Sequence, residues 1–391
     1  MDRAMVRFIL YRLLRAGITL LLFQTLLFLM LQAMPGDFVS TLIGLPPPLR
    51  RGLRAVMGLN DPLWQQYLRW MRDFFTGHLG TTFRFPHQSV GRILWSLAPR
   101  TLFLFLPASV LSIGLGYGLG RYLGGRRRPW DGASLMLTGG AIVAATSFPP
   151  WVAFLLVQIF ALRLGWFPAE NVLGTGRWVG ATVSADTVIL WLLGTGGLMM
   201  GAFYLLGRVT RWHRHRTCLR RVGAIALIGG AVLAWYLSGW GLLALDLLWH
   251  LALPLTTVVL LSFGEPMLLM RLAMLQVANE DYVRAARAKG LPPQVVRDRH
   301  MARLALVPVL ARFLIQLPFV MLGSMVVELA FFWKGIGREL LTAIDAHDVP
   351  VVMGIFSVVG TLMLLAHVLL DILHAWLDPR VRMTIAPGMQ R

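Results

Sequence analysis

The side chains that could do chemistry in this sequence are few, and they form no catalytic set. Residues 213–218 carry two histidines and a cysteine at metal-ligand spacing, but the arginines among them would repel a cation. Ser147, Ser262 and Ser324 have no neighbouring base that could activate a hydroxyl. The sequence contains no glycine-rich phosphate loop ending in Lys-Ser or Lys-Thr. We therefore expect a protein that is not an enzyme and that binds neither a metal nor another cofactor of its own.

Two carboxylates, Glu265 and Glu328, stand inside long apolar stretches. A charged group is costly in such surroundings, and where it occurs it commonly marks a polar pathway. Pro266 follows the first glutamate and leaves a backbone carbonyl nearby without its helical donor. The sequence predicts that both glutamates line a translocation pathway or its gate, with a structural salt bridge as the alternative for Glu328.

The third candidate is a docking surface. Residues 280–290 start with acidic side chains, end with basic ones and stop at a glycine, which is the charge order and terminator of a short helix. Leu291-Pro292-Pro293 prevents its continuation. With the small Ala285 and Ala286 exposed, such a helix suits the groove of another protein. The residues expected to make this contact are Asp281, Tyr282, Arg284, Ala285, Ala286, Arg287, Lys289 and Gly290.

The composition indicates which elements hold these groups in place. Of 391 residues, 57% are hydrophobic and 14% are charged, whereas an average globular protein has about half and about a quarter. A soluble chain could not hide that much apolar surface, and a disordered chain would need more charge. The single cysteine, Cys218, excludes an intramolecular disulfide. We expect an all-α polytopic membrane protein.

Eight stretches are long and apolar enough to cross a membrane, which takes about 20 helical residues. They are continuously apolar, whereas the strands of a membrane barrel alternate. The first stretch lacks a cleavage site and is expected to stay as a membrane anchor. The stretches cover residues 13–33, 101–122, 134–162, 187–207, 222–243, 248–272, 306–331 and 351–375.

The net charge of +19 is explained by topology. If the N-terminus lies inside, the inner segments hold 24 Lys and Arg residues, whereas the short outer loops hold four. Positive charge accumulates on the cytoplasmic side of membrane proteins. Both termini are therefore predicted to be cytoplasmic, and no nucleic-acid partner is needed to explain the basic excess.

Two features predict contacts around the second stretch. Small residues four positions apart let helix backbones approach closely in lipid, within the chain or between subunits, although glycine is also simply frequent in membrane helices. The glycines of the second stretch at this spacing are Gly114, Gly116, Gly118 and Gly120.

Before the second stretch, residues 63–75 place aromatic and apolar side chains at helical spacing, as in an amphipathic helix on the outer surface.

An ordered set of motifs gives the sequence a resemblance to a known family over most of its length. It resembles the permease subunit of bacterial ATP-binding-cassette importers of the dipeptide, oligopeptide and nickel class. The motifs are Met34-Pro35-Gly36-Asp37, Ser147-Phe148-Pro149, Leu164-Gly165-Trp166-Phe167-Pro168, Asp281 through Gly290, Val327-Glu328 with Gly335-Ile336-Gly337, and Leu377-Asp378-Pro379-Arg380.

The resemblance implies a type I importer permease fold with a six-helix core and a helix that couples to an ATPase subunit. The family has a Glu-Ala-Ala motif with a glycine four positions after the last alanine; Ala285, Ala286 and Gly290 match, and Arg284 replaces the glutamate. Residues 282–290 would then sit in a cleft of the ATPase. ATP and Mg would be bound by that partner.

The same resemblance implies an assembly in the bacterial inner membrane that imports short peptides by rigid-body alternating access. The implied partners are a second homologous permease, two cytoplasmic ATP-binding subunits, an extracytoplasmic solute-binding protein and membrane lipid. The main alternative is a stand-alone secondary transporter that couples ions through Glu265 and Glu328, for which inverted repeats would be expected. A membrane anchor or sensor would not need the docking helix.

The sequence departs from the family by two extra stretches, which are interpreted as an inserted hairpin. Six arginines near its inner turn would favour anionic lipid headgroups or an acidic partner, or would simply orient the hairpin. The predicted parts are an anchor helix 1–33, an external segment 34–100, two core spans 101–171, the hairpin 172–246, and core spans 247–391 with the coupling loop 272–305.

Overall fold

The computed structural model describes residues 3–42, 45–85, 88–125, 131–168, 177–181, 183–210 and 216–377. Regular structure in these ranges is helical, apart from one isolated bridge between Thr81 and Ser89. The helices are α1 Arg3–Gln32, α2 Phe38–Thr41, α3 Pro47–Val56, α4 Leu63–Phe75, α5 Val90–Gly124, α6 Gly132–Thr146, α7 Pro149–Leu156, η1 Val157–Arg163, α8 Ala185–Val209, α9 Arg216–Leu237, α10 Gly241–Ser262, α11 Gly264–Val277, α12 Asp281–Ala288, α13 Pro293–Val295, η3 Val296–Met301, α14 Ala302–Ala330, α15 Ile336–Asp345 and α16 Val349–Leu377.

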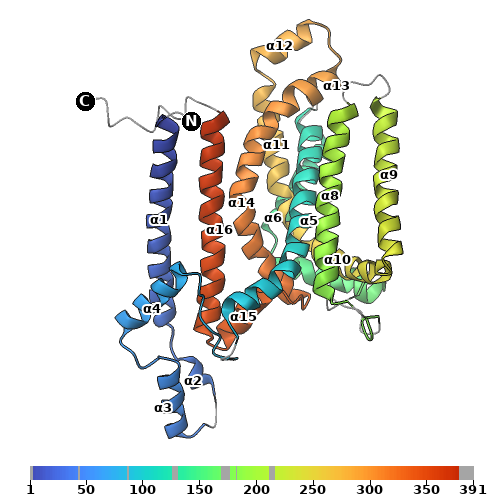
Figure 1. The fold of residues 1–391 in the computed structure, drawn as a ribbon. Helices are drawn as coiled ribbons and strands as arrows, with labels where there is room; N and C mark the ends of the chain where they lie inside the picture. The colour runs from blue at the N-terminus through green and yellow to red at the C-terminus, as the bar shows by residue number, and fades with distance from the viewer. Residues whose placement is uncertain are drawn as a thin grey trace, which may run out of the picture.

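The predicted membrane architecture is confirmed. Within the described residues, seven helical segments are long and apolar enough to cross a membrane, and a bent pair of helices makes an eighth candidate. The N-terminal end of α1 and the C-terminal end of α16 lie on the same side of the bundle as α12. The helices α2 to α4 extend from the opposite side (Figure 1). The seven segments are Arg7–Gln32, Val90–Gly124, Ala185–Val209, Cys218–Leu237, Gly241–Val277, Pro293–Leu317 and Val349–Leu369.

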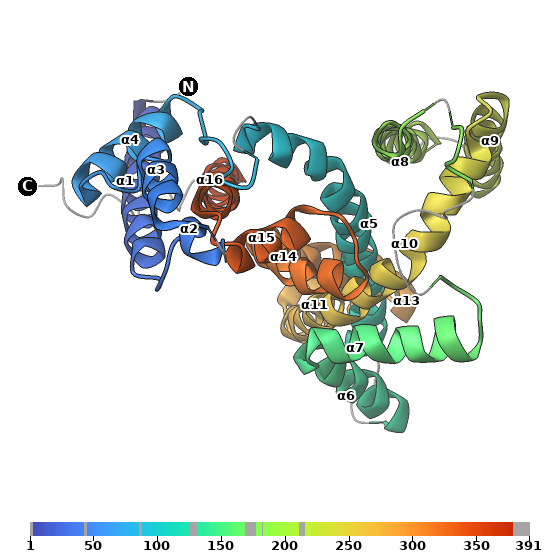
Figure 2. The ribbon, with the colours of Figure 1, turned by 90° about the horizontal axis from the view of Figure 1, so that it is seen from below.

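The third predicted span is not a continuous helix. The segments Gly132–Thr146 and Pro149–Arg163 meet at an angle of 110°. The break between the two helices has a local cause. Pro149 and Pro150 have no N–H to continue the hydrogen bonds of α6, and Pro149 takes the favoured first position of α7. Viewed from below, α7 is seen along its length whereas α8 and α16 are seen end-on (Figure 2).

The centre of the bundle is formed by α5, α10, α11 and α14. A buried cluster joins Leu104 of α5, Leu247 of α10 and Trp333 beyond α14. The Trp333 indole N–H donates to the Arg100 carbonyl at 3.0 Å, so the segment after the C-terminal end of α14 is bound to α5. The anchor helix α1 packs beside α16 at one side of this core.

The predicted hairpin is formed by α8 and α9, which stand at the far side of the bundle from α1 (Figure 2). It is attached to the core through α8: Arg100 of α5 holds Asp186 with two bonds of 2.6 and 3.0 Å. The second helix of the hairpin ends earlier than predicted, because Gly239 adopts a positive φ of 75° and α10 already starts at Gly241.

The outer segment contains the predicted amphipathic helix as α4. Its buried face packs through Trp70 against Phe28 of α1 and Met353 of α16. The Tyr67 hydroxyl lies 2.8 Å from the Thr25 hydroxyl. Packing on the helical bundle therefore accounts for Tyr67, Trp70 and Phe74, whereas Trp64, Leu68 and Phe75 of the same helix stay exposed.

Candidate functional site

The predicted docking helix is α12, which projects beyond the ends of the spans on the side of α13 (Figure 1). Asp281 occupies its first turn and Arg287 its last, so each charge interacts favourably with the helix dipole. Gly290 closes the turn after it with a φ of 70°, a conformation that other residues rarely adopt. The local signals in the sequence thus determine where this helix starts and stops.

One face of α12 is buried against the rest of the inner loop. Val283 is fully buried and Ala286 is 5% exposed, in a cluster with Val296, Met301 and Met274. The expectation that both alanines face outward is wrong for Ala286. Because Val283 and Ala286 are three positions apart, they share one helix face, and the burial of the larger side chain takes the alanine with it.

The opposite face of α12 is polar and open. We call Asp281, Tyr282, Arg284 and Ala285 the docking face, since all four are exposed. The Arg284 and Asp281 side chains lie 3.6 Å apart but are 68% and 99% exposed, so their ion pair contributes little to stability. Partial burial and the nearby Glu280 carboxylate raise the pKa of the Tyr282 hydroxyl. At neutral pH the docking face offers a neutral phenol between opposite charges.

A second candidate site is a cavity of about 280 Å³ between the broken helix and α10, α11 and α14. Its wall is largely apolar but includes several polar side chains, as a binding site requires. The cavity therefore has the mixed lining of a candidate binding site. The polar members are Ser147, Ser262, Glu265, Gln316 and Ser324.

Glu265, which the sequence predicts as a pathway or gate residue, lines this cavity, and its role in a pathway stays a prediction. Its carboxylate accepts a hydrogen bond from the Gln316 amide, and the Arg312 Nε lies 3.5 Å from its Oε1. The Glu265 and Arg312 side chains are 39% and 56% exposed. Such exposure is too costly against lipid, so this part of the surface must face an aqueous space or another protein.

Glu328 has a different environment. It is completely buried, and its Oε2 accepts the N–H groups of Gly337 at 2.7 Å and Arg338 at 3.2 Å. The structure thus places Glu328 inside the protein, away from the cavity wall, where it binds the first turn of α15. A contribution of Glu328 to a gate stays a prediction.

The four glycines of α5 divide into two pairs. A Cβ on Gly116 would lie 2.6 Å from Pro266 Cβ, and one on Gly120 would lie 2.6 Å from the Met267 carbonyl. These two glycines let α11 approach the α5 backbone. Nothing lies within 4 Å of the Cβ position at Gly114 or Gly118, so that face of α5 is free in the described chain.

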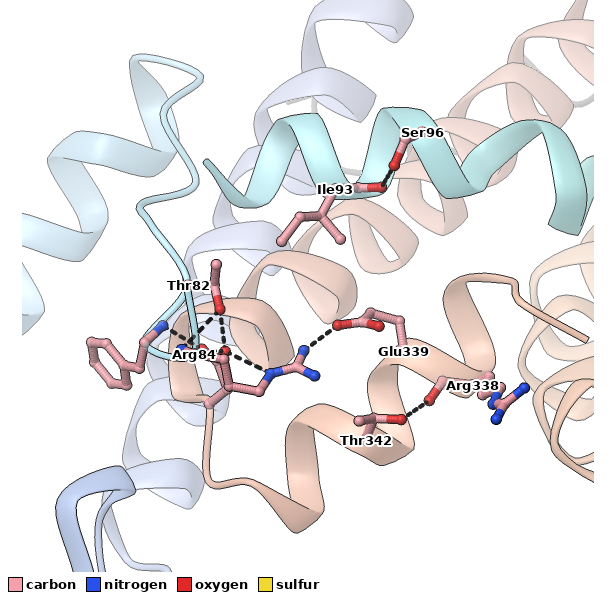
Figure 3. Close-up of polar contacts among 9 residues, drawn as sticks. Thr82, Arg84, Ile93, Ser96, Arg338, Glu339 and Thr342 are labelled. Carbon is pink, nitrogen blue, oxygen red and sulfur yellow. Dashed lines mark hydrogen bonds and ion pairs between the residues drawn. The ribbon is translucent and has the colours of Figure 1, made fainter. Parts of the chain in front are cut away.

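A polar network between residues 82–84, α15 and the start of α16 was not found from the sequence. The buried Asp348 accepts hydrogen bonds from the Thr82 hydroxyl, the Phe83 N–H at 3.1 Å and the Arg84 Nε at 3.2 Å. The Arg84 guanidinium also pairs with Glu339 of α15 (Figure 3). Burial opposes protonation of Arg84, but the two carboxylates outweigh it and raise its pKa. The network joins segments 264 positions apart, a relation that no local pattern carries.

In the part of the chain that the structure describes, no group of three or more His, Cys, Asp or Glu residues could hold a metal ion. The His213 and His215 segment lies outside the described residues, as does most of the motif that ends at Arg380.

Comparison with known families and proteins agrees with this architecture. Residues 221–383 match the family described as binding-protein-dependent transport system inner membrane component, and residues 5–89 match the N-terminal region of such membrane components. Together the two matches include nearly all of α1, residues 34–89, most of α9, and α10, α11, the docking helix and the last core helices.

Relatives align over nearly the whole chain. A di/tripeptide transport system permease protein of Pseudomonas aeruginosa is 29% identical over 94% of this chain and 94% of its own length. An oligopeptide transport system permease protein of Bacillus subtilis is 25% identical, covering 93% and 96%. A putative peptide permease protein of Brucella ovis is 27% identical, covering 97% and 100%. Such names give no support to an ion-coupled transporter that works alone.

Proposed function

Because the chain belongs to the family of binding-protein-dependent transport system inner membrane components, the permease subunits of ABC importers of the peptide class, we propose that it forms half of a membrane pathway for short peptides. Partner subunits hydrolyse ATP, and this chain converts their movement into reorientation of the pathway. The relatives named as di/tripeptide and oligopeptide permeases support this choice of cargo.

The observation that carries the proposal is the construction of α12. Val283 and Ala286 fix its buried face on η3, which continues into α14, whereas the docking face is exposed. A coupling helix needs this combination. Movement of a partner bound to the exposed face is transmitted to the helices packed against the buried face, whereas an unpacked loop would not transmit it. One ATP-binding subunit would bind α12 of this chain, and a second ATP-binding subunit would bind the corresponding helix of a second, homologous permease.

Topology supports the placement of the partners. We infer that α12 and both chain ends are cytoplasmic, since the basic residues gather in the inner segments. The N-terminal end of α1, the C-terminal end of α16 and the docking helix α12 lie on one side of the bundle, as this topology requires (Figure 1). The outer segment, with α2 to α4, then faces the extracytoplasmic solute-binding protein. The chain itself supplies no ATP or Mg site in this scheme.

The test is an arginine on the docking face. Ala285→Arg keeps the buried cluster intact but adds a long charged side chain to the contact, so co-purification of the ATP-binding subunits should fall roughly tenfold or more, with a parallel loss of peptide-stimulated ATP hydrolysis. Ala286→Arg is a poorer test because Ala286 is buried and the change would disturb the packing of α12 itself.

The matched control is Ala55→Arg, which places the same side chain on an exposed alanine of α3, on the opposite side of the bundle. It should leave the ATP-binding subunits attached. Full retention of those subunits by the Ala285→Arg chain would exclude α12 as the coupling contact.

We propose that the hairpin of α8 and α9 is an insertion that leaves the core topology unchanged, because two added spans restore the original side of the membrane. Replacing residues 184–240 by a short glycine-rich linker should preserve the cytoplasmic position of α12. Cysteine labelling of an introduced Ala285→Cys would report that position, and labelling from outside the cell would contradict the six-span core.

A further inference from the structure

The cavity beside Glu265 has an unusual wall on one side, formed by the broken helix. Ala145, Ser147 and Pro149 line it from the junction of α6 and α7. Non-helical backbone at membrane depth is tolerated where it is buried in protein or lines a polar cavity. Glu265 lies about 18 Å along α11 from its inner end at Val277, at 1.5 Å per residue, so the junction facing it is well within the ~30 Å of hydrocarbon.

The junction is rich in hydrogen-bond acceptors. An α-helical carbonyl normally binds the N–H four residues later, but for Ala145 and Thr146 those residues are Pro149 and Pro150, which have none. Both carbonyls therefore lack their helical donors. They also form the C-terminal end of α6, where the helix dipole is negative. The wall attracts a positively charged donor.

A close helix contact brings the carboxylate to the same place. A Cβ on Gly264 would lie 2.5 Å from the Ala141 carbonyl and 3.2 Å from Ala145 Cβ, so only glycine lets α11 start against the last turn of α6. Glu265 is the next residue, and it lines the cavity. The glycine thus fixes the carboxylate beside the acceptor-rich junction.

The carboxylate keeps capacity for a ligand. Gln316 occupies one acceptor position, and Arg312 at 3.5 Å is beyond the 2.7–2.9 Å typical of a charge-assisted hydrogen bond. An ionised carboxylate has about four acceptor positions. What this set of groups recognises is a compact cation with several N–H donors, such as a primary ammonium.

We propose that this cavity is a subsite for the N-terminal ammonium group of a peptide in transit, held by Glu265 together with the backbone carbonyl of Ala145, which lines the cavity at the end of α6. The proposal rests on the peptide-permease function above and names the group on the cargo that this chain contacts.

The test compares two probes on the detergent-solubilised importer without its solute-binding protein: trialanine, which has a free ammonium group, and N-acetyl-trialanine, which does not. At millimolar concentration trialanine should raise the midpoint of thermal unfolding of the wild-type complex, and the acetylated peptide should not. Glu265→Gln preserves shape and the contact with Gln316 but removes the charge, so the apparent affinity for trialanine should fall about tenfold. Asp371→Asn, which removes the partly buried ion pair with Arg12 at 2.8 Å at the other side of the bundle, should respond like the wild type.

Three outcomes would overturn the subsite: no shift with trialanine up to tens of millimolar, equal shifts with both peptides, or an undiminished response in Glu265→Gln. The comparison of the two peptides on the wild-type complex needs no variant and stands even if the substituted chain assembles poorly. Transport of trialanine by the complete importer separates the two proposals, because its absence would contradict the peptide-permease function, whereas transport without a role for Glu265 would contradict only the subsite.

Discussion

The Glu328 carboxylate and the Gly337 backbone are joined by a hydrogen bond of 2.7 Å, which closes the chain between α14 and α15 into a fixed turn. Gly335 lies so close to that carboxylate that a Cβ there would be 2.4 Å from Glu328 Oε1. The motif that joins a glutamate to Gly-Ile-Gly is thus one structural unit: the acid caps α15, and the glycine makes room for the acid.

Glu328→Ala should therefore lower stability rather than alter cargo selection. It leaves the N–H groups of Gly337 and Arg338 without an acceptor, at about 1–3 kcal/mol for each. Gly335→Ala should also destabilise the protein, because its methyl group must displace a buried carboxylate. Thermal unfolding in detergent measures both, with Gly323→Ala as control, since no atom lies within 4 Å of that Cβ position. If the Gly335→Ala chain unfolds at the same temperature as the wild type, the capping role of Glu328 is contradicted.

The two glycine pairs of α5 should respond differently to the same substitution. Gly120→Val inserts a branched side chain against the Met267 carbonyl and Met270 Cβ, both 2.6 Å from the Cβ position, and should destabilise the chain by about 1–3 kcal/mol or prevent its folding. Gly118→Val meets nothing in the described chain and should leave the unfolding of the isolated subunit unchanged.

The second permease subunit makes Gly118→Val informative in another way. If the open face of α5 contacts that subunit, the valine variant will fold but will fail to co-purify with it. Equal destabilisation of the isolated chain by valine at Gly118 and at Gly120 would show that the two faces are not distinct.

Arg84→Ala should loosen the outer segment. The substitution leaves Asp348 fully buried without its cationic partner, which costs up to about 3 kcal/mol. The hydroxyl of Thr82 and the N–H of Phe83 still bind that carboxylate, so local opening is expected instead of global unfolding. Proteolysis within α3 and α4 should become faster. Arg92→Ala, an exposed arginine nearby, should leave the cleavage rate unchanged.

The start of the outer segment should respond to acid. Burial opposes ionisation of Asp37, but hydrogen bonds from Arg54 and Ser40 outweigh it and hold the pKa of this carboxyl below 3.8. A lowered pKa in the folded state means that the stabilisation is complete above the ordinary pKa and disappears as the pH falls through the lowered value. Protection of the Ser40 amide against hydrogen exchange, corrected for the intrinsic rate, should be constant at neutral pH and decrease only below about pH 4.

Arg54→Gln provides the contrast for that measurement. Without the guanidinium, which lies 2.7 Å from the Asp37 carboxylate, protection should decrease at a higher pH than in the wild type. An Asp37→Asn chain should show weaker protection with no acid step at all. Identical pH profiles for the wild type and Asp37→Asn would remove the carboxylate from the explanation.

The Ser147-Phe148-Pro149 segment shows both what a local pattern can specify and where it stops. Pro149 and the following Pro150 end α6 wherever the segment lies, and both were visible in the sequence. The angle of 110° was not, because it depends on the surfaces of α10 and α14 that α7 packs against. The predicted span 134–162 is therefore present as two helices that meet at a sharp bend.

The sequence by itself determined the membrane class, the number of long apolar segments and the limits of α12, because hydropathy and helix termini depend on neighbouring residues. Only the tertiary structure decided which glycines of α5 meet α11, which alanine of α12 is buried, and that Glu265 shares a cavity with Gln316, 51 positions away, whereas Glu328 does not. In helices that are apolar around most of their surface, the pattern of side chains does not say which face meets which neighbour. That choice is made by packing, when every helix of the bundle is in place.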